Sequence, residues 1–223
     1  MPTVLITGAG RGIGLEFARQ YAADGWDVLA TCRNEGAGEE LRALPGSVTV
    51  EFLDMRDHAA LVAFSDRVSG PLDLFIANAG MTRPDGFSAA DADGWLEVLD
   101  VNCVAPTFLA HHLAPQVIAA RGKMIAITSQ MGSIADNGSG GWNAYRASKA
   151  ALNAAWRSMA VETAGEPIAI AMLHPGWVRT DMGGPGGTLS KPESVAAMRR
   201  VIDGLTSRDK GLFLNHRGET LPW

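Results

Sequence analysis

The chain has 223 residues, of which 47% are hydrophobic and 19% charged, and its formal net charge is −5. These values are typical of one globular domain and exclude a disordered, collagen-like or coiled-coil chain. Because there is no basic excess, nucleic acid is not an expected partner. The two cysteines, Cys32 and Cys103, are too few for a disulfide framework, which favours a reducing compartment.

Residues 101–120 contain no Asp, Glu, Lys or Arg, and the stretch is long enough to compare with a membrane-spanning helix. It also contains an asparagine, two histidines, a glutamine and two prolines, which is more typical of a buried helix. The first residues lead straight into an apolar run and glycines, without the basic start of a signal peptide. We therefore expect a cytoplasmic protein with no membrane partner.

Short apolar runs alternate with longer helical patterns along the whole chain. Several runs are continuously apolar, which is typical of strands buried on both faces of a sheet. The alternation predicts right-handed crossovers, and therefore a doubly wound parallel sheet of about seven strands with helices on both faces. The expected strands are 3–7, 27–31, 48–53, 72–77, 123–128, 168–173 and 211–214, and the expected helices lie near 12–24, 57–68, 101–120, 143–164 and 192–206.

We find no internal repeat, charged linker or break in composition, so 1–223 is expected to form one Rossmann-type α/β domain. Ser190 and Glu193, with Pro192 between them, have the spacing of a capping box and predict the start of the last helix. The glycine-rich stretch 183–187 is expected to be a mobile loop between two elements.

The first expected strand runs into Thr7-Gly8-Ala9-Gly10-Arg11-Gly12-Ile13-Gly14, and a helix follows. Glycines let the backbone turn tightly and approach a phosphate, while the helix N-terminus supplies N–H groups and a partial positive charge. In this position the turn is typical of a dinucleotide-binding site, and the alternative is a plain glycine-rich connection. The expected cofactor contacts in the turn are Gly8, Gly10, Arg11, Gly12, Ile13 and Gly14.

The end of the second expected strand bears on the choice of cofactor. It reads Ala30-Thr31-Cys32-Arg33-Asn34 and lacks the acidic residue that binds a ribose 2′-hydroxyl. Arg33 suits a 2′-phosphate instead, and Arg11 adds a second cation. Each arginine alone fits an ordinary solvated position. Together they favour NADP(H), with NAD(H) as the alternative.

Tyr145 and Lys149 are four residues apart in a helical pattern and therefore share one helix face. A phenol with its usual pKa near 10 is a poor acid–base group at neutral pH, but a neighbouring ammonium group stabilises the phenolate. Together with a dinucleotide turn, the pair suits proton transfer to or from a carbonyl oxygen.

The chain carries a series of motifs over its whole length: Thr7-Gly8-x₃-Gly12-x-Gly14, Asn78-Ala79-Gly80, Asn102, Ser129, Tyr145-x₃-Lys149 and Pro175-Gly176. In this order they resemble the short-chain dehydrogenase/reductase family. The stretches 131–134, 144–149 and 174–183 are similar to the subgroup of that family that contains C-factor and the Sniffer carbonyl reductase.

The resemblance implies an NAD(P)-dependent hydride-transfer site for a small carbonyl or alcohol. Tyr145 would protonate the carbonyl oxygen, and Lys149 would hold the nicotinamide ribose and lower the tyrosine pKa. Ser129 would donate a hydrogen bond to the substrate oxygen, and Asn102 would position a water. Asp54 would meet the adenine amino group, and Thr180 the carboxamide or pyrophosphate. The cofactor cleft would be lined by Asp54, Met55, Asn78, Ala79, Gly80, Tyr145, Lys149, Pro175, Gly176, Val178 and Thr180.

The sequence leaves alternatives open at the site. The stretch 136–141 lengthens the interval between Ser129 and Tyr145, so Ser133 is a second candidate for the substrate contact, although Ser129 directly follows a strand. Trp142 and Trp177 are candidates for lining the substrate pocket. Reduction of an aldehyde, ketone or quinone, or the reverse oxidation, is the expected activity. The alternative is a dinucleotide-binding signalling or regulatory protein, which would not need all of the catalytic residues.

No residue is expected to bind a metal, because the adjacent His111 and His112 point to different sides of a helix. The helices near 101–120 and 143–164 carry small and apolar residues on more than one face. In the resembling family the matching helices form a four-helix interface, so we expect a homo-oligomer, most simply a dimer. The alternative is that one chain covers both helices.

Overall fold

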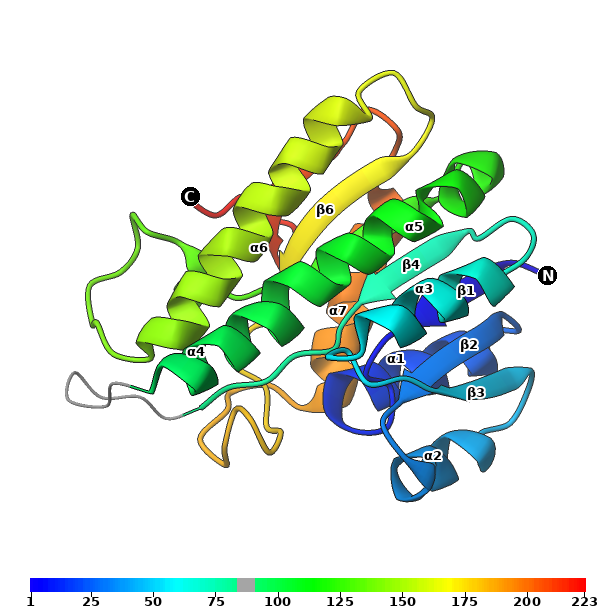
Figure 1. Cartoon of the computed structure of the whole chain (residues 1–223), viewed down its shortest axis with the longest axis horizontal. Helices are drawn as coiled ribbons and strands as arrows, with labels where there is room; N and C mark the ends of the chain where they lie inside the picture. Colours follow the sequence, from blue (N-terminus) through cyan, green and yellow to red (C-terminus); the bar gives the residue numbers. More distant parts are fainter. Residues whose placement is uncertain (84–90) are drawn as a thin grey trace.

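The structure is a computed structural model that describes residues 1–83 and 91–223. Seven strands form one parallel sheet in the order β3-β2-β1-β4-β5-β6-β7 (Figure 1). This confirms the predicted doubly wound sheet. The strands are β1 (Thr3–Ile6), β2 (Asp27–Cys32), β3 (Val48–Phe52), β4 (Leu74–Ala77), β5 (Lys123–Ile127), β6 (Ala169–His174) and β7 (Lys210–Asn215).

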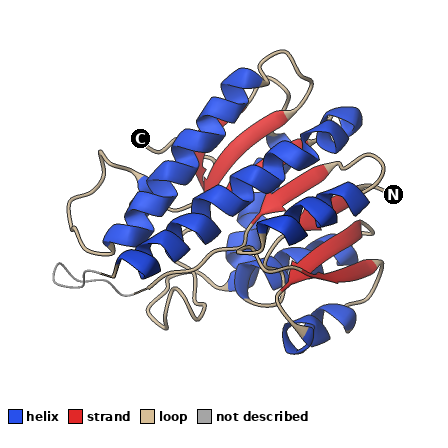
Figure 2. Ribbon diagram, in the orientation of Figure 1, coloured by secondary structure: helices blue, strands red, loops and turns tan. Residues whose placement is uncertain are grey.

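Helices cover both faces of the sheet (Figure 2). Residues of α1 and α7 pack on one face, while residues of α3, α5 and α6 pack on the face turned to the viewer in Figure 1. The helices are α1 (Gly12–Ala23), α2 (Glu35–Arg42), α3 (His58–Arg67), α4 (Ala92–Leu99), α5 (Ala105–Ala120), α6 (Asn143–Glu162) and α7 (Lys191–Gly204).

Two of these helices, α2 and α4, are not predicted by the sequence pattern. Each is eight residues long, about two turns, and buries only two residues, so its pattern is too short to be distinguished from that of a connecting loop. Side-chain caps start both: Asn34 accepts from the N–H of Ala37 at 3.1 Å, and Asp91 accepts from the N–H of Gly94 at 2.9 Å. Helices this short are not stable in isolation, so packing against the rest of the domain must stabilise them.

The helix expected over 101–120 has an irregular start. A π-helical turn covers Asp100–Val104, and regular α-helix begins with α5 at Ala105. Such turns are rare and are frequently found at functional sites. This one contains Asn102, a residue expected at the active site.

Strand burial explains the apolar runs of the sequence. All four residues of β4 are buried, and β5 and β6 are buried except at one end each. Their side chains divide between two cores, one on each face of the sheet. Trp156 and Met159, large apolar residues of the helix that was expected at an interface between chains, are buried in one of these cores.

The sheet order reverses between β1 and β4, which are neighbours although β2 and β3 separate them in the chain. In doubly wound folds such a switch point opens a crevice at the carboxyl ends of the strands. The glycine turn follows β1, and Asn78-Ala79-Gly80 follows β4. The fold therefore brings these two motifs to the same crevice.

Hydrogen bonds cross the connection between β6 and α7, which contains the glycine-rich stretch 183–187. Trp177 Nε1 donates to the carbonyl oxygen of Gly183 at 2.7 Å, and Arg179 Nη1 donates to that of Gly187 at 2.9 Å. The capping box formed by Ser190 and Glu193 is present at the start of α7, as predicted. Within the described residues, no helix is both long and apolar enough to cross a membrane.

Candidate active site

The glycine turn after β1 lies in close contact with neighbouring backbone. Gly8 has a φ of +64°, and a Cβ there would lie 2.8 Å from the Cα of Ala79. A Cβ at Gly10 would lie 2.6 Å from the carbonyl oxygen of Ala37. Gly8 is therefore required by its backbone conformation and by space, and Gly10 by space alone.

The segment after β4 is hydrogen-bonded to this turn. Asn78 Nδ2 donates to the carbonyl oxygens of Thr7 at 2.9 Å and Gly8 at 3.1 Å. The backbone N–H groups of Asn78 and Ala79 both donate to Thr7 Oγ1 at 3.1 Å. These hydrogen bonds fix the shape of the glycine turn. The side chain of Asn78, which was expected to line the cofactor cleft, is therefore bound to the backbone of the turn.

The start of α1 is suited to a diphosphate. Among the described residues, its N-cap Arg11 makes no side-chain cap hydrogen bond, which leaves the first-turn N–H groups to a ligand. Gly12 has a φ of +62°, and the Thr180 methyl carbon, at 3.9 Å, is the nearest atom to a Cβ built there. Open space, N–H groups and the helix dipole together fit a dinucleotide phosphate.

The two arginines expected at a 2′-phosphate have different surroundings. Arg11 forms an ion pair of 2.6 Å with Asp181, which follows Thr180 in the connection after β6. Arg33 is exposed and makes no hydrogen bond or ion pair with any residue in the described part of the chain. Arg33 is therefore the cation available to a phosphate, whereas Arg11 bridges the glycine turn to the segment after β6.

Tyr145 and Ser129 meet at the carboxyl end of β5. Tyr145 lies in the first turn of α6, and Ser129 precedes a short 3₁₀ turn, Gln130–Gly132, where its Oγ accepts from the N–H of Met131 at 3.1 Å. Burial raises the pKa of Tyr145 above its usual value, and a side-chain hydrogen bond with Ser129 partly offsets this effect. The structure thus brings together the two groups expected at the substrate oxygen.

Lys149 lies one helical turn beyond Tyr145 and is buried. Its Nζ donates to the carbonyl oxygen of Ile127 at 2.9 Å and lies 5.9 Å from the centre of the Tyr145 ring. A Cβ on Gly80 would lie 3.7 Å from this Nζ, so the ammonium group also borders the segment after β4. Burial lowers the pKa of Lys149 to about 8, and Cys103 partly opposes the effect.

The expected lowering of the Tyr145 pKa by Lys149 is not found. The Tyr145 pKa is raised, whereas that of Lys149 falls to about 8. Burial of both groups is the physical reason, because each is driven toward its neutral form.

Ser133, the alternative to Ser129, is engaged elsewhere. Its Oγ donates to the carbonyl oxygen of Trp223 at 3.3 Å and accepts from the N–H of Asp136 at 3.1 Å. It therefore holds the loop before α6 against the segment after β7. Of the two serines, Ser129 is the one hydrogen-bonded to Tyr145.

Asn102 is completely buried, and protein groups occupy most of its side chain. Its Oδ1 accepts from the N–H of Met81 at 2.8 Å, and its Nδ2 donates to the carbonyl oxygen of Met81 at 2.8 Å and to Ser148 Oγ at 3.0 Å. Both amide protons are used, which leaves one acceptor position on Oδ1. The hydrogen bonds of the Asn102 side chain hold the segment after β4 in place. The single remaining acceptor position is what this side chain has left for the water that it was expected to position.

The segment after β6 crosses the same edge of the sheet. Gly176 has a φ of +80°, and a Cβ there would lie 2.6 Å from Leu189 Cδ1 and 3.0 Å from His216 Nδ1. The carbonyl oxygen of Pro175 accepts from Ser194 Oγ at 2.6 Å, and Thr180 Oγ1 accepts from the N–H of Gly183 at 3.0 Å. Thr180 lies near Gly12, as its expected role requires, while the buried Val178 anchors the segment.

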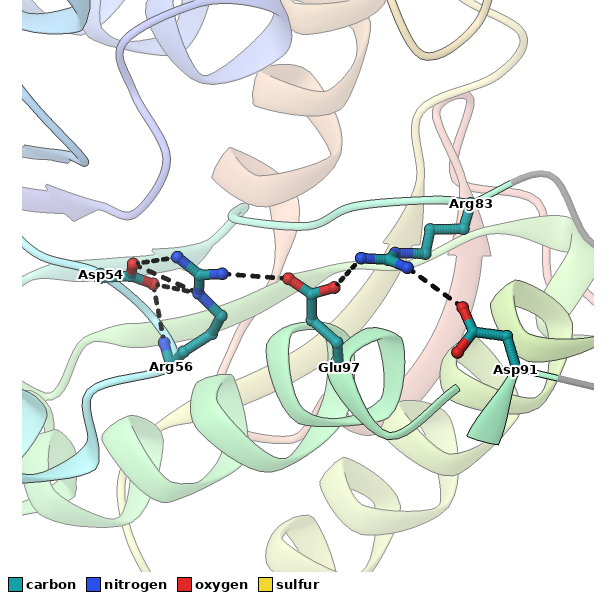
Figure 3. Close-up of polar contacts among 5 residues, drawn as sticks. All are labelled: Asp54, Arg56, Arg83, Asp91 and Glu97. Carbon is teal, nitrogen blue, oxygen red and sulfur yellow. Dashed lines mark hydrogen bonds and ion pairs between the residues drawn. The ribbon is translucent and has the colours of Figure 1, made fainter. Parts of the chain in front are cut away.

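Asp54 follows β3 at the carboxyl edge, and both of its carboxylate oxygens accept hydrogen bonds from Arg56 (Figure 3). The hydrogen bond from Arg56 is the largest cause of a lowered Asp54 pKa. Met55, also expected at the cofactor, is buried. The sequence analysis did not identify Arg56, Asp181 or Glu97, which lie near these expected site residues. For Arg56 the signal was the charge of alternating sign around Asp54, which is also common on solvated surfaces, and Glu97 and Asp181 are too far from Asp54 in the sequence to share it.

A family model described as short chain dehydrogenase matches residues 2–187 of this chain. Together with the sheet order, the glycine turn and the Ser129, Tyr145 and Lys149 cluster, this match shows that the chain belongs to the short-chain dehydrogenase family. The protein is therefore an oxidoreductase of the NAD(P)-dependent class, as the sequence resemblance implied.

Individual relatives agree with the expected subgroup. C-signal of Myxococcus xanthus is 41% identical over 164 residues, which cover 72% of this chain and 99% of that protein. A short-chain dehydrogenase/reductase from Burkholderia multivorans with bound NADP superposes with a TM-score of 0.92 at 35% identity, covering 100% of this chain and 99% of that chain. The Sniffer carbonyl reductase of D. melanogaster superposes with a TM-score of 0.93 at 32% identity, with full coverage of both chains.

Proposed function

We propose that this protein reduces a carbonyl compound, an aldehyde, ketone or quinone, to the alcohol with NADPH, or catalyses the reverse oxidation. The observation that carries the proposal is the placement of Ser129 and Tyr145 together at the carboxyl end of β5, where Ser129 is near enough to lower the pKa of the tyrosine. The pair lies beside the buried Lys149, at the same sheet edge as the glycine turn.

The residues around the crevice fit a dinucleotide. The uncapped N-terminus of α1 would hold the diphosphate, and the unpaired Arg33 supports a 2′-phosphate and hence NADP(H). The similarity to the NADP-bound Burkholderia multivorans structure and to the Sniffer carbonyl reductase supports the same choice. When bound, the reduced nicotinamide supplies the hydride that the chain's own side chains lack.

The side chains have complementary roles in this proposal. Tyr145 donates its phenolic proton to the carbonyl oxygen, and its raised pKa keeps that proton in place at neutral pH. Ser129 donates a hydrogen bond to the same oxygen and stabilises the charge that develops there. Lys149, with its ammonium group near Gly80, holds the nicotinamide ribose.

Two exposed tryptophans support a substrate with an apolar body. Trp142 directly precedes α6 and is 42% exposed, and Trp177 follows Gly176 and is 56% exposed. Each adjoins a segment of the proposed site, Trp142 the start of the Tyr145 helix and Trp177 the connection after β6. Aromatic side chains of this kind commonly line pockets for small apolar ligands.

Replacing Tyr145 with Phe tests the proposal, because it removes one oxygen and keeps the ring. Turnover of aldehydes, ketones and quinones with NADPH should fall by roughly 10² to 10⁴, the usual range for general acid–base catalysis. NADPH binding, measured in the same sample, should remain. Near-normal reduction by the Tyr145→Phe protein would mean that its chemistry, if any, takes place elsewhere.

A regulatory role is the second candidate, and the 41% identity to C-signal is the observation that favours it. A regulatory protein would bind NADP(H) without turning over any member of the same carbonyl panel. In that case the Tyr145→Phe protein would retain its regulatory effect in the cell. If the protein acts as an enzyme, the same substitution would abolish both turnover and the cellular effect that depends on it.

A further inference from the structure

A row of five charged side chains of alternating sign crosses the carboxyl edge of the sheet (Figure 3). Neighbouring members are 2.5 to 3.2 Å apart, and each guanidinium lies between two carboxylates. The row joins the loop after β3, the segment after β4 and helix α4. We call it the arginine ladder, and its members in order are Asp54, Arg56, Glu97, Arg83 and Asp91.

At one end of the ladder, Arg56 grips the Asp54 carboxylate on both oxygens. Oδ1 accepts from the Arg56 backbone N–H and from Arg56 Nε, both at 3.0 Å. Oδ2 accepts from Nη2 at 2.6 Å, with Nε further away at 3.3 Å. The single Nε proton is shared between the two oxygens and is nearer to Oδ1, so Nη2 is the one donor directed at Oδ2 alone, and Oδ2 is the oxygen better able to accept from a further donor. The grip fixes the orientation of the carboxylate and leaves Oδ2 able to accept.

Glu97 holds Arg56 in turn. Its Oε1 accepts from Arg56 Nη1 at 3.1 Å, and its Oε2 accepts from Arg83 Nη2 at 2.5 Å. At 23% side-chain exposure, Glu97 is the least exposed member of the ladder. Isolated surface ion pairs contribute little to stability, whereas a forked arginine in a connected row sets geometry. The ladder therefore acts on position more than on stability.

The far end of the ladder lies close to the glycine of α4. A Cβ on Gly94 would lie 2.9 Å from Arg83 Nη1 and 2.8 Å from Asp91 Cγ. A larger residue would therefore shift the contact between these two exposed side chains.

The family resemblance places the adenine base of the dinucleotide at Asp54, which follows β3 at the carboxyl edge of the sheet. The N–H of Leu53 donates to the carbonyl oxygen of Cys32 at 2.8 Å, which aligns the ends of β3 and β2. Arg33, the proposed partner of the ribose phosphate, is near enough to Asp54 to contribute to its lowered pKa. Next to the ribose is the adenine ring, whose exposed donor is its 6-amino group.

We propose that Arg56, held by Glu97, is a positioning residue that orients Asp54 to accept a hydrogen bond from the adenine 6-amino group of the cofactor. This inference rests on the proposed NADPH site but does not require turnover. An aspartate has a usual pKa near 4, so Asp54 is ionised at neutral pH with or without Arg56. Loss of Arg56 therefore acts through the orientation of the carboxylate.

The test measures binding of NADPH and of its hypoxanthine analogue, in which an oxygen replaces the 6-amino group, by fluorescence titration without substrate. Wild type should bind NADPH about tenfold more tightly, as expected for a hydrogen bond to a charged group. Arg56→Lys keeps the charge without the fork, and Arg56→Met removes both, so each should reduce the ratio to about two or less. Glu97→Gln should give an intermediate ratio.

Arg83→Met is the matched control, because it breaks the ladder at Glu97 and leaves every bond between Arg56 and Asp54 intact. It should keep the wild-type ratio. Equal binding of the two dinucleotides by wild type, or an undiminished ratio in the Arg56 variants, would overturn the proposal. If the Arg56 variants do not fold, the Glu97→Gln variant decides. A ratio of NADPH to analogue affinity below that of wild type supports the proposal, and an undiminished ratio overturns it. Normal NADPH discrimination without turnover would contradict the proposed function and leave this inference standing.

Discussion

Ser129 and Ser133 differ in what their hydroxyl groups bind. Ser129 is hydrogen-bonded to Tyr145, whereas Ser133 joins the loop before α6 to the carbonyl oxygen of Trp223. Spacing along the chain left both serines as candidates for the substrate contact, because a longer loop separates Ser129 from Tyr145. The hydrogen-bond partners favour Ser129 for that role.

We expect Ser129→Ala to lower kcat by roughly 10² to 10³, the usual cost of a lost oxyanion donor, with little change in NADPH binding. Ser133→Ala should change kcat less than threefold, because its hydroxyl faces protein groups. Steady-state kinetics of both variants on one carbonyl substrate provide the measurement. Equal losses in the two variants would contradict the assignment.

The lowered pKa of Lys149 makes cofactor affinity depend on pH. Burial brings this pKa from 10.5 to about 8. If the ammonium group holds the nicotinamide ribose, binding raises the Lys149 pKa in the complex. Affinity is then complete below about pH 8 and falls as the pH rises from there toward the higher pKa of the complex.

Titration of NADPH binding between about pH 6.5 and 9.5 should therefore show the Kd rising above about pH 8, the pKa of Lys149. The Lys149→Met protein should bind NADPH more weakly at neutral pH. Its Kd should not rise above about pH 8, because the substitution removes the ammonium group whose titration causes the rise. A wild-type Kd that stays level over the whole interval would show that the ammonium group does not contribute to binding.

At the scale of elements, the ends of β1 and β2 present their arginines differently. Arg11 begins α1 and is paired with Asp181, while Arg33 follows β2 and is unpaired among the described residues. The sequence predicted both as partners of a 2′-phosphate. The structure leaves Arg33 as the cation that needs no rearrangement to take that role.

Arg33→Asp should reverse the cofactor preference, because a 2′-phosphate would then face a carboxylate while a 2′-hydroxyl could donate to it. The ratio of NADPH to NADH affinity should change by more than tenfold. Arg11→Ala is the informative comparison and should change that ratio less. Tighter binding of NADH than NADPH by the wild-type protein would show that the argument from Arg33 is wrong.

At the scale of the whole molecule, α5 and α6 lie side by side on one face of the sheet (Figure 1). Their largest apolar side chains, such as Trp156, are covered within the chain. Near the outer surface of this face, Val104 is 47% exposed and Val161 is 60% exposed, and Ala154 in the middle of α6 is also exposed. We propose that the surface formed by Val104, Ala154 and Val161 contacts a second copy of the chain.

Light scattering at micromolar concentration should give about twice the 23.5 kDa of one chain. Ala154→Arg should shift the mass toward the monomer, because a long charged side chain would enter the interface, while its thermal unfolding midpoint should change little at an exposed helical site. A monomeric wild-type mass would contradict the proposal and would mean that the chain covers both helices sufficiently by itself.

The sequence by itself determined the sheet, most of the helices and the family. Apolar runs such as 124–127 are typical of strands buried on both faces, and their alternation with helical patterns allows few topologies. The spacing of Tyr145 and Lys149 suggested a proton-transfer pair, and the resemblance to the family added Ser129 to the same cluster. Helices α2 and α4 were missed because each has only eight residues, too few for an apolar pattern to distinguish a helix from a loop.

Only the tertiary structure decided what each side chain contacts. The side-chain amide of Asn102 is used by Met81 and Ser148, Arg11 is paired with Asp181, and Asp54 is held by Arg56. The contacts of Asn102 and Arg11 join residues that are far apart in the sequence. Asp54 and Arg56 are only two residues apart, but their contact depends on the side-chain conformation of Arg56, which Glu97 helps to hold. Local spacing carries no information about such contacts, and burial, which reverses the expected shift of the Tyr145 pKa, is a property of the whole fold.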